Sequence, residues 1–572
     1  MIIKKKLSLF LAIILVLTLL TGCSAESTPV AEPVQTDTAP VTEAPTEAPT
    51  EAPTEAPTEA PTEAPTEAPT EPPVTVSEDV AALLKDSEFY HLDNTAALAP
   101  YYAEAEARKE AILNTPTEIV KSDTFIPGET YTGKAIYVSP NGSDDNDGRS
   151  PETPLKTLEK AQHDWIDSGD IVFLERGQIH RAPWWGIQTN ADNITYSAYG
   201  EGAKPVITVV AENSARSECW ELYYEGPNGE KIWKYYKNLG DVAGIIFDDE
   251  SYAKRIFEWP TKSGKWLQLE IRWDDPADGF DNDHILYSNE EASVIEEALT
   301  DDLTYITRVK EPYNISKNKK TYGPLYLRCD GGNPGELYQD IEIIDTASDI
   351  RIQGKVKNFV LDNISVKYFT GSPVSTGLGS GKGMVIQNCT FEWIGSQICE
   401  LRHDRHIGFF LQGSGIYNTV NNATIRNNYF YQCVNAFHMD SYKESQKTLG
   451  GMTITGNLID SCNKGIQIEL CNWYKSKPMK SIVIQDNIIM NTGKGMNYLS
   501  ALPAAAIDLT WEAAQYAKTI EISDNVFLGC TCSLIRIPDP DVVQTNIHNN
   551  VFAQDPGQLL LTYGWDKPEF MP

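Results

Sequence analysis

Seven segments of the C-terminal half decide the fold: NFVLDNISV (358–366), MVIQNCTF (384–391), ATIRNNYF (423–430), MTITGNLI (452–459), SIVIQDNII (481–489), TIEISDNVF (519–527) and QTNIHNNVF (544–552). Each is a short strand-like run that contains an asparagine, and these asparagines recur at intervals of 25, 40, 29, 30, 38 and 25 residues. A period of about 25 to 30 residues indicates a solenoid, and the longer intervals mark loop insertions. The sequence therefore predicts a parallel β-helix with a stacked asparagine ladder: Asn363, Asn388, Asn428, Asn457, Asn487, Asn525 and Asn550.

A second strand of each coil follows when the coils are aligned on these asparagines. The alignment places 415–419, 436–440, 465–469 and 495–499 side by side. Side chains alternate between the two faces of a strand, so one set points into the core: Ile416, Phe437, Ile466 and Met496. The outward set is polar and forms a column of expected substrate contacts: Tyr417, His438, Gln467, Asn497 and Arg536.

Two carboxylates stand beside this column, Asp440 and Glu469. Adjacent strands lie ~4.8 Å apart, so we expect these residues to be close neighbours that face solvent. Two such groups suppress each other's ionisation, which supplies the acid and the anion that glycoside hydrolysis requires. A carboxyl separation of about 5 to 5.5 Å would favour retention. The alternative interpretation is that these acids only keep an acidic surface soluble.

Loop insertions flank the same face and add further candidates. The insertion at 396–412 contains Glu400, a reserve candidate for the catalytic acid, and His403 and Asp404, which we expect to contact substrate. Two histidines three residues apart without a third ligand are weak evidence for a metal, so we predict no metal site there. Trp473 and Trp511 are expected aromatic contacts in other loops. A further insertion, 499–518, adds Asp508 and Glu512.

The chain before the repeats has its own strand and turn pattern. Residues 135–207 contain AIYVSPNGSDDNDG, a short amphipathic helix, GDIVFLERGQIHR and ITYSAYGEGAKPVI. Together these pieces resemble the opening of the pectate-lyase-like superfamily, which implies a right-handed parallel β-helix and includes glycoside hydrolases and polysaccharide lyases. Residues 211–345 interrupt the pattern and predict an inserted, mainly antiparallel β-rich subdomain, whose tryptophans we assign to its core. The acidic turn around Asp144 and Asp147 could bind calcium, but a structural turn is the favoured interpretation.

The N-terminal 134 residues predict export and anchoring. Three lysines precede an apolar run that ends in Leu-Thr-Gly-Cys, which resembles a bacterial lipobox, so 1–22 is the expected signal peptide and Cys23 the lipidated residue. Thr-Glu-Ala-Pro repeats make 23–75 an extended linker, because a proline at every fourth position prevents helix and sheet. Residues 76–134 contain an alanine-rich helix, expected to cap the coils that follow. We place first coils at 135–210 and the repeat region with the binding face at 346–572.

Composition limits the partners of the chain. The formal net charge of −33 argues against nucleic acid and anionic surfaces. Ten cysteines, one of them the lipidation candidate, leave an odd number, so we expect buried thiols rather than a disulfide framework. We expect a monomer on the extracellular face of a bacterial membrane, with a plant-type polysaccharide as partner. Three functions stay open: a glycoside hydrolase without a cofactor, a calcium-dependent polysaccharide lyase that would use a lysine or arginine base, and a binding protein without catalysis.

Overall fold

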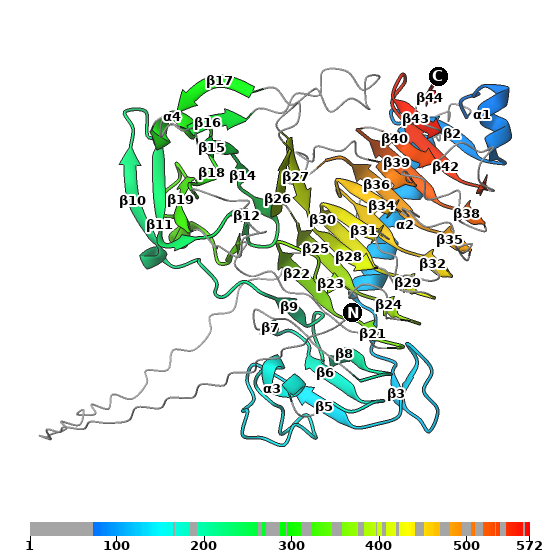
Figure 1. Cartoon of the computed structure of the whole chain (residues 1–572), viewed down its shortest axis with the longest axis horizontal. Helices are drawn as coiled ribbons and strands as arrows, with labels where there is room; N and C mark the ends of the chain where they lie inside the picture. Colours follow the sequence, from blue (N-terminus) through cyan, green and yellow to red (C-terminus); the bar gives the residue numbers. More distant parts are fainter. Residues whose placement is uncertain are drawn as a thin grey trace, which may run out of the picture. The chain divides into compact units, whose positions relative to one another are not determined.

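The fold is an all-β solenoid with three parallel sheets. The computed structural model describes residues 73–163, 166–182, 191–260, 266–269, 287–292, 294–309, 322–345, 357–375, 382–395, 397–402, 408–418, 422–440, 451–469, 481–494, 505–509, 519–531, 533–537, 545–563 and 567–572. Successive strands of each coil enter the first, second and third sheets in turn, and equivalent strands pair from coil to coil (Figure 1). The predicted right-handed parallel β-helix is confirmed.

The first sheet runs, in spatial order, through β5 (Ala135–Val138), β6 (Ile171–Glu175), β8 (Thr195–Tyr199), β21 (Val360–Asp362), β24 (Val385–Gln387), β29 (Thr424–Arg426), β32 (Met452–Thr455), β35 (Ile482–Gln485), β38 (Ile520–Ser523), β41 (Thr545–His548) and β1 (Leu84–Lys85). The second sheet consists of β7 (Ile179–Arg181), β9 (Val206–Thr208), β22 (Ser365–Phe369), β25 (Thr390–Ile394), β30 (Tyr429–Cys433), β33 (Leu458–Asp460), β36 (Ile488–Thr492), β39 (Val526–Cys530), β42 (Val551–Gln554) and β2 (Glu88–His91).

The third sheet carries the face predicted to bind substrate. Its strands are β23 (Val374–Ser375), β28 (Ser414–Asn418), β31 (Asn435–Asp440), β34 (Lys464–Glu469), β37 (Ala505–Asp508), β40 (Ser533–Ile537), β43 (Leu559–Tyr563) and β44 (Lys567–Phe570). Only the last pair of this sheet, β43 with β44, is antiparallel among these strands. The antiparallel return therefore ends the run of parallel pairs in the third sheet.

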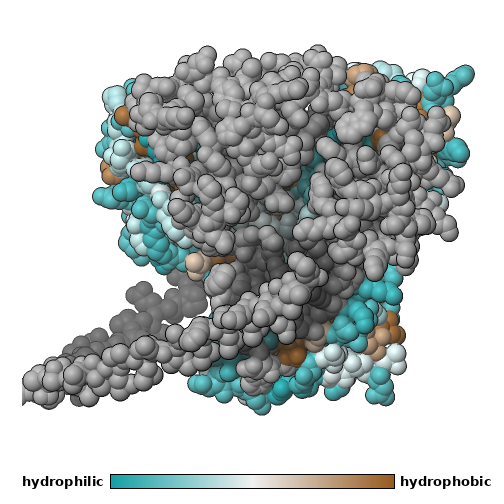
Figure 2. All heavy atoms as spheres, in the orientation of Figure 1, coloured by the Kyte–Doolittle hydropathy of each residue, from teal (hydrophilic) through white to brown (hydrophobic). Residues whose placement is uncertain are grey.

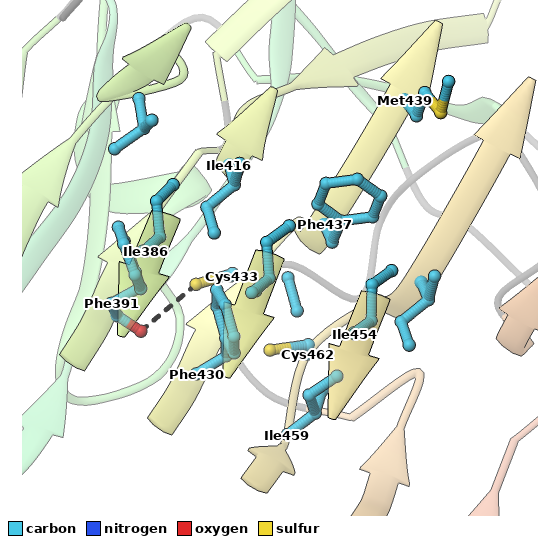
Figure 3. Close-up of a cluster of buried hydrophobic side chains, with 14 of the residues drawn as sticks. Ile386, Phe391, Ile416, Phe430, Cys433, Phe437, Met439, Ile454, Ile459 and Cys462 are labelled. Carbon is cyan, nitrogen blue, oxygen red and sulfur yellow. Dashed lines mark hydrogen bonds between the residues drawn. The ribbon is translucent and has the colours of Figure 1, made fainter. Parts of the chain in front are cut away.

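The interior of the coils is apolar and close-packed. Phe391 and Phe430 stack with their ring centroids 5.0 Å apart, and Ile416 and Phe437 pair in the register predicted from the sequence (Figure 3). Each new coil repeats the same inward positions, so burial continues along the axis without a separate core for each repeat. The described atoms visible in the space-filling view are mostly hydrophilic, with small separate hydrophobic patches (Figure 2).

The asparagine ladder is present from Asn428 onward. The Nδ2 group of Asn428 donates to Oδ1 of Asn457 at 3.0 Å, and the same contact continues through Asn487, Asn525 and Asn550 at 2.9 to 3.0 Å. All five side chains are buried. Because buried amides need partners, this chain of contacts fixes the turn between the first and second sheets.

The prediction was wrong for the first two ladder positions. Gln387 pairs with Arg426, so Asn388 aligns with Asn427, and it is Cys389 whose backbone N–H donates to Oδ1 of Asn428. Asn388 and Asn427 share a left-handed backbone, with φ of 54° and 53°. Asparagine is favoured there because it tolerates this conformation. Asn363, with φ of 60°, belongs to the same column, one residue before the ladder.

The predicted thiols lie in the core. Cys433, Cys462 and Cys530 are buried and free, and burial beside Cys462 raises the pKa of Cys433 well above its usual value. Figure 3 shows Cys433 and Cys462 on neighbouring coils. Cys530, however, pairs with Thr492, which occupies the coil between Cys462 and Cys530. Each of these cysteines follows a ladder asparagine by five residues, which predicts one stack of three, but Thr492 interrupts that stack.

Residues 78–113 pack along the outside of the solenoid and add strands to its last coil. α1 (Glu78–Leu83) leads into β1 and β2, which pair with β41 and β42 and so add to the last coil. α2 (Thr95–Leu113) then packs on the outer face of the second sheet through Leu98, Ala105 and Ile112 (Figure 1). Instead of closing the first coil, the predicted helix lies across several coils. α3 (Leu158–His163) packs Leu158 and Ala161 against the interior at β5.

The acidic turn before α3 has a structural role. Oδ1 of Asp144 accepts from the backbone N–H groups of Lys156 and Thr157 at 3.0 and 2.9 Å. Oδ1 of Asp147 accepts from Thr153 Oγ1 at 2.7 Å. These contacts hold the turn in place, as the favoured interpretation predicted.

The insert forms a β-rich subdomain, mainly antiparallel as predicted. Trp220 is buried in its core and its indole N–H donates to the Ser214 carbonyl at 2.9 Å. Short helices accompany the sheets: η1 (Ser217–Cys219), α4 (Ile295–Ala298) and α5 (Pro334–Leu337). The three sheets are β10 (Trp220–Glu225), β11 (Lys231–Leu239), β19 (Gly323–Arg328), β18 (Thr304–Thr307) and β14 (Lys254–Arg255); β13 (Ser251–Tyr252), β12 (Val242–Phe247) and β20 (Ile341–Asp345); and β15 (Glu258–Pro260), β16 (Trp266–Leu269) and β17 (Tyr287–Ala292). Two further short pairs are β3 (Val120–Lys121) with β4 (Thr130–Tyr131), and β26 (Gln397–Arg402) with β27 (Gly408–Gln412).

Candidate functional site

A polar column crosses the third sheet, with one residue from each of the strands β28, β31, β34, β37 and β40. Backbone register pairs Tyr417 with His438, His438 with Gln467, Gln467 with Asp508, and Asp508 with Arg536. Four of these five residues were predicted contacts, and the structure brings them together as expected. We call these five residues the polar column.

The sequence alignment failed at the fourth coil. The strand beside β34 is β37, where Ile507 pairs with Ile466, so 495–499 is not the neighbouring strand. Asp508 occupies the place in the column that was given to Asn497, and Ile507 the inward place that was given to Met496. The insertion in this coil precedes the strand rather than following it. The run Ala-Ala-Ile at 505–507 between polar segments was the available signal for a buried strand.

The column is buried rather than open to solvent. The exposed fraction is 1% for Asp508, 3% for Gln467, 7% for Arg536 and 8% for His438, while Tyr417 is half-buried. The rings of Tyr417 and His438 meet edge to face at 5.2 Å. Charges at such depth interact more strongly than charges in water, because the surroundings polarise less.

Asp508 lies between two cations. Its Oδ2 is 3.2 Å from NH1 of Arg536 and 3.8 Å from Nζ of Lys464. Arg536 belongs to the next coil and Lys464 to the preceding one, so the carboxylate bridges three coils. The sequence offers Lys464, with Lys443 and Arg536, as a possible base for the lyase alternative, and it places Asp508 in the 499–518 insertion.

A diagonal contact between successive coils explains how Lys464 reaches this position. Nδ2 of Asn435, the first residue of β31, donates to Oε1 of Gln467 on the next strand at 3.1 Å. Lys464 is the first residue of β34 and reaches Asp508 on the next strand in the same way. The coil geometry thus directs the first residue of a strand toward the column residue of the following coil.

The two predicted catalytic carboxylates occupy neighbouring backbone positions. Asp440 pairs with Glu469 in the register of β31 and β34. Their side chains lie outside the described part of the structure, as does that of Glu400, whose backbone pairs with Phe410 in the β26–β27 hairpin. The remaining predicted site residues also lie outside the described residues: Asn497, His403, Asp404, Trp473, Trp511 and the lipidation candidate Cys23.

Within the described ranges, no group of three or more histidine, cysteine, aspartate or glutamate side chains could hold a metal ion. The described residues also contain no helix that is both long and apolar enough to cross a membrane.

Comparison with known proteins gives a partial family match and remote structural similarity. Residues 376–526 match the family described as Protein of unknown function (DUF1565). No curated protein matches the chain.

Three solved structures illustrate the remote similarity. The complex of XylC with xylose has 14% identity and a TM-score of 0.41, covering 75% of this chain and 68% of that one. The GH136 lacto-N-biosidase from Eubacterium ramulus has 11% identity and a TM-score of 0.31, over 76% and 68% of the chains. Pectate lyase Pel9A has 11% identity and a TM-score of 0.30, over 76% and 77%. At these identities the similarity concerns the fold alone.

Proposed function

We propose that this chain is a carbohydrate-active enzyme, a glycoside hydrolase whose site is the third sheet around Asp440, Glu469 and the polar column. The observation that carries the proposal is the register of β31 with β34. It pairs Asp440 with Glu469 two residues along the strands from the pair of His438 and Gln467. By strand alternation we expect both carboxylates on the face of the column, where one would act as acid and the other as base or nucleophile.

The surroundings of the pair suit a polyhydroxylated substrate. The column offers a phenol, an imidazole, an amide and a guanidinium within one line of adjacent strands, which can orient sugar hydroxyls by hydrogen bonds. A lyase is disfavoured because Lys464 and Arg536, two cations that could serve as its base, both contact Asp508.

Product analysis separates the three functions left open by the sequence. We expect purified protein, incubated with a panel of plant polysaccharides, to release reducing ends without an unsaturated product that absorbs in the ultraviolet. An unsaturated product that disappears with a calcium chelator would establish the lyase instead. Binding to a polysaccharide without any product would establish the non-catalytic function.

Substitution of the carboxylates tests the assigned residues. Asp440→Asn or Glu469→Gln should reduce kcat by a factor of ~100 to 10,000, the usual contribution of general acid or base catalysis, with the melting temperature nearly unchanged. His438→Ala should cost less. Glu225→Gln, an exposed carboxylate on β10, is the matched control and should keep full activity. Full activity in the Asp440→Asn, Glu469→Gln double variant would refute the assignment and move attention to Glu400, Asp404 and Asp508.

A further inference from the structure

An ion cluster of Asp508, Lys464 and Arg536 lies on the third sheet, beside the proposed catalytic pair Asp440 and Glu469. Lys464 and Arg536 both contact the same oxygen, Oδ2 of Asp508, and their side chains are 3% and 8% exposed. The cations come from strands on either side of β37, the strand that carries Asp508. Asp508 therefore acts as a shared counter-ion for Lys464 and Arg536.

The position of Lys464 does not depend on a substrate. The Asn435 to Gln467 contact repeats the same diagonal one coil earlier, and Thr562 Oγ1 lies 3.5 Å from Ser533 Oγ in the same arrangement at the far end. The diagonal is thus a recurrent feature of the third sheet. Between β34 and β37 the same diagonal brings the ammonium group of Lys464 to the carboxylate of Asp508.

This arrangement affects which sugars the site can accept. Strands β31, β34, β37 and β40 carry two cations, Lys464 and Arg536, and one more acid than that: Asp440, Glu469 and Asp508. A sugar carboxylate would have to displace Asp508 from buried cations and would meet two further acids. A sugar hydroxyl carries no charge, so it neither needs to displace Asp508 nor is repelled by the other two acids.

We infer that Asp508 is a specificity-determining residue. Its carboxylate pairs with Lys464 and Arg536, so that the site binds neutral glycans and excludes uronic acids. The inference rests on the proposed function for the place of the site, and it deepens that function by naming the substrate class. It differs from a catalytic role, because Asp508 acts through the two cations.

Selectivity of the intact protein is the first test. Binding is measured calorimetrically for two panels of equal chain length, neutral oligosaccharides such as xylo- and galacto-oligosaccharides, and oligogalacturonates with their methyl esters. Wild type should bind at least one neutral oligosaccharide, and each free uronate about tenfold or more weakly than its ester. Tighter binding of a free uronate than of every neutral sugar, lost in Arg536→Gln, would overturn the inference.

Replacement of the counter-ion is the second test. Asp508→Asn leaves two buried cations without their shared carboxylate, so an added anion should occupy the gap. We expect sodium acetate to raise the melting temperature of Asp508→Asn relative to sodium chloride at equal ionic strength, and neutral acetamide to have no such effect. Asp508→Glu should keep wild-type selectivity and show no acetate effect. If Asp508→Asn does not fold, refolding yield with acetate against chloride gives the same readout.

The two tests distinguish the failure of each proposal. Absence of any hydrolysis would refute the proposed function, whereas acetate rescue is measured without turnover. Equal melting of Asp508→Asn in acetate and chloride would overturn the counter-ion role even if the protein hydrolyses polysaccharide.

Discussion

The side chain of Asn457 makes hydrogen bonds to the coils before and after its own. Its Oδ1 accepts from the backbone and side chain of Asn428, and its Nδ2 donates to the Ile425 carbonyl and to Oδ1 of Asn487. Asn457→Ala should lower the free energy of unfolding by about 3 kcal/mol, because buried donors and acceptors lose their partners. Urea denaturation measures the loss. Asn546→Ala, at an exposed position, is the control, and a loss below about 1 kcal/mol at Asn457 would contradict the ladder's structural role.

Residue-scale prediction succeeded where one residue type has one physical use. Five of the seven ladder asparagines are correct because a buried amide stack requires both a donor and an acceptor at that point. Asn363 and Asn388 were misplaced because asparagine also suits the left-handed position one residue earlier, with φ of 60° and 54°. The sequence pattern alone does not separate these two uses, whereas the pairing of Gln387 with Arg426 does.

At the scale of elements, α2 supports the second sheet from outside, through Leu98, Ala105 and Ile112. Nineteen residues of helix span about 28 Å, and coils spaced at ~4.8 Å give about six in that length. Ala105 contributes to the cluster that includes Tyr429 and Leu458 on two successive coils. The helix therefore ties several coils together from outside.

Matched substitutions on α2 test this packing. Ala105→Glu should lower the midpoint of thermal unfolding by several degrees, because a carboxylate would be forced into an apolar contact. Ala107→Glu introduces the same group at an exposed position of the same helix and should change the stability by less than about 0.5 kcal/mol. Similar effects at both positions, read by differential scanning calorimetry, would argue against the docking of α2 seen here.

The junction between insert and solenoid predicts a pH effect. Glu342 on β20 is 2.9 Å from Arg181 on β7. Burial raises the pKa of Glu342 to about 7; Arg181 opposes this, and nearby Asp340 and Asp249 reinforce it. Between pH 4.5, the ordinary pKa of a glutamate, and about pH 7, Glu342 keeps its proton in the folded chain but loses it in the unfolded chain. The contribution of Glu342 to stability is therefore full below pH 4.5 and disappears as the pH rises through 7.

Glu342→Gln should remove that part of the pH dependence. The wild type should lose stability relative to the variant between pH 4.5 and 7, on the order of 1 kcal/mol per pH unit. Denaturant unfolding at several pH values gives both curves. Glu336→Gln, an exposed carboxylate in α5, should leave the wild-type slope intact. Parallel curves for the wild type and Glu342→Gln would contradict the assignment.

Strands of the third sheet were predicted correctly where the loop insertion of the coil was placed on the correct side of the strand. Alignment on the ladder gave the correct register for β31 and β34, which begin seven residues after Asn428 and Asn457. β28 begins later in its coil, after the insertion at 396–412, and was placed correctly because that insertion was recognised in the sequence. In the next coil the extra residues come first, so β37 begins ten residues beyond the expected strand. Asp508 was consequently assigned to a loop, and its contact with Lys464 and Arg536 could not be anticipated.

At the scale of the described molecule, residues 78–113 join the last coil of the solenoid to earlier coils. β1 and β2 extend the sheets beyond β41 and β42, and His91 contacts the carbonyl of Pro572 at 2.8 Å. The described chain thus begins at the C-terminal coil, reaches the first coil through α2, and returns coil by coil. The repeat period predicted the solenoid, but residues 78–113 have no repeat signature, which is why the helix was expected at the opposite end.

Anchoring is the remaining prediction at this scale, and it rests on the sequence alone. The lipobox-like Leu-Thr-Gly-Cys before the Thr-Glu-Ala-Pro linker predicts a lipid on the thiol of Cys23, with the folded part held away from the membrane by the linker. Cys23→Ser should move the protein from the membrane fraction to the soluble fraction while the melting temperature of the folded part stays the same. The neighbouring Ser24→Ala variant keeps the thiol and should remain in the membrane fraction. Because a covalent lipid binds by hydrophobic insertion and not by charge, a high-salt wash should not release the wild type. A Cys23→Ser protein that still sediments with membranes in high salt would refute the lipid anchor.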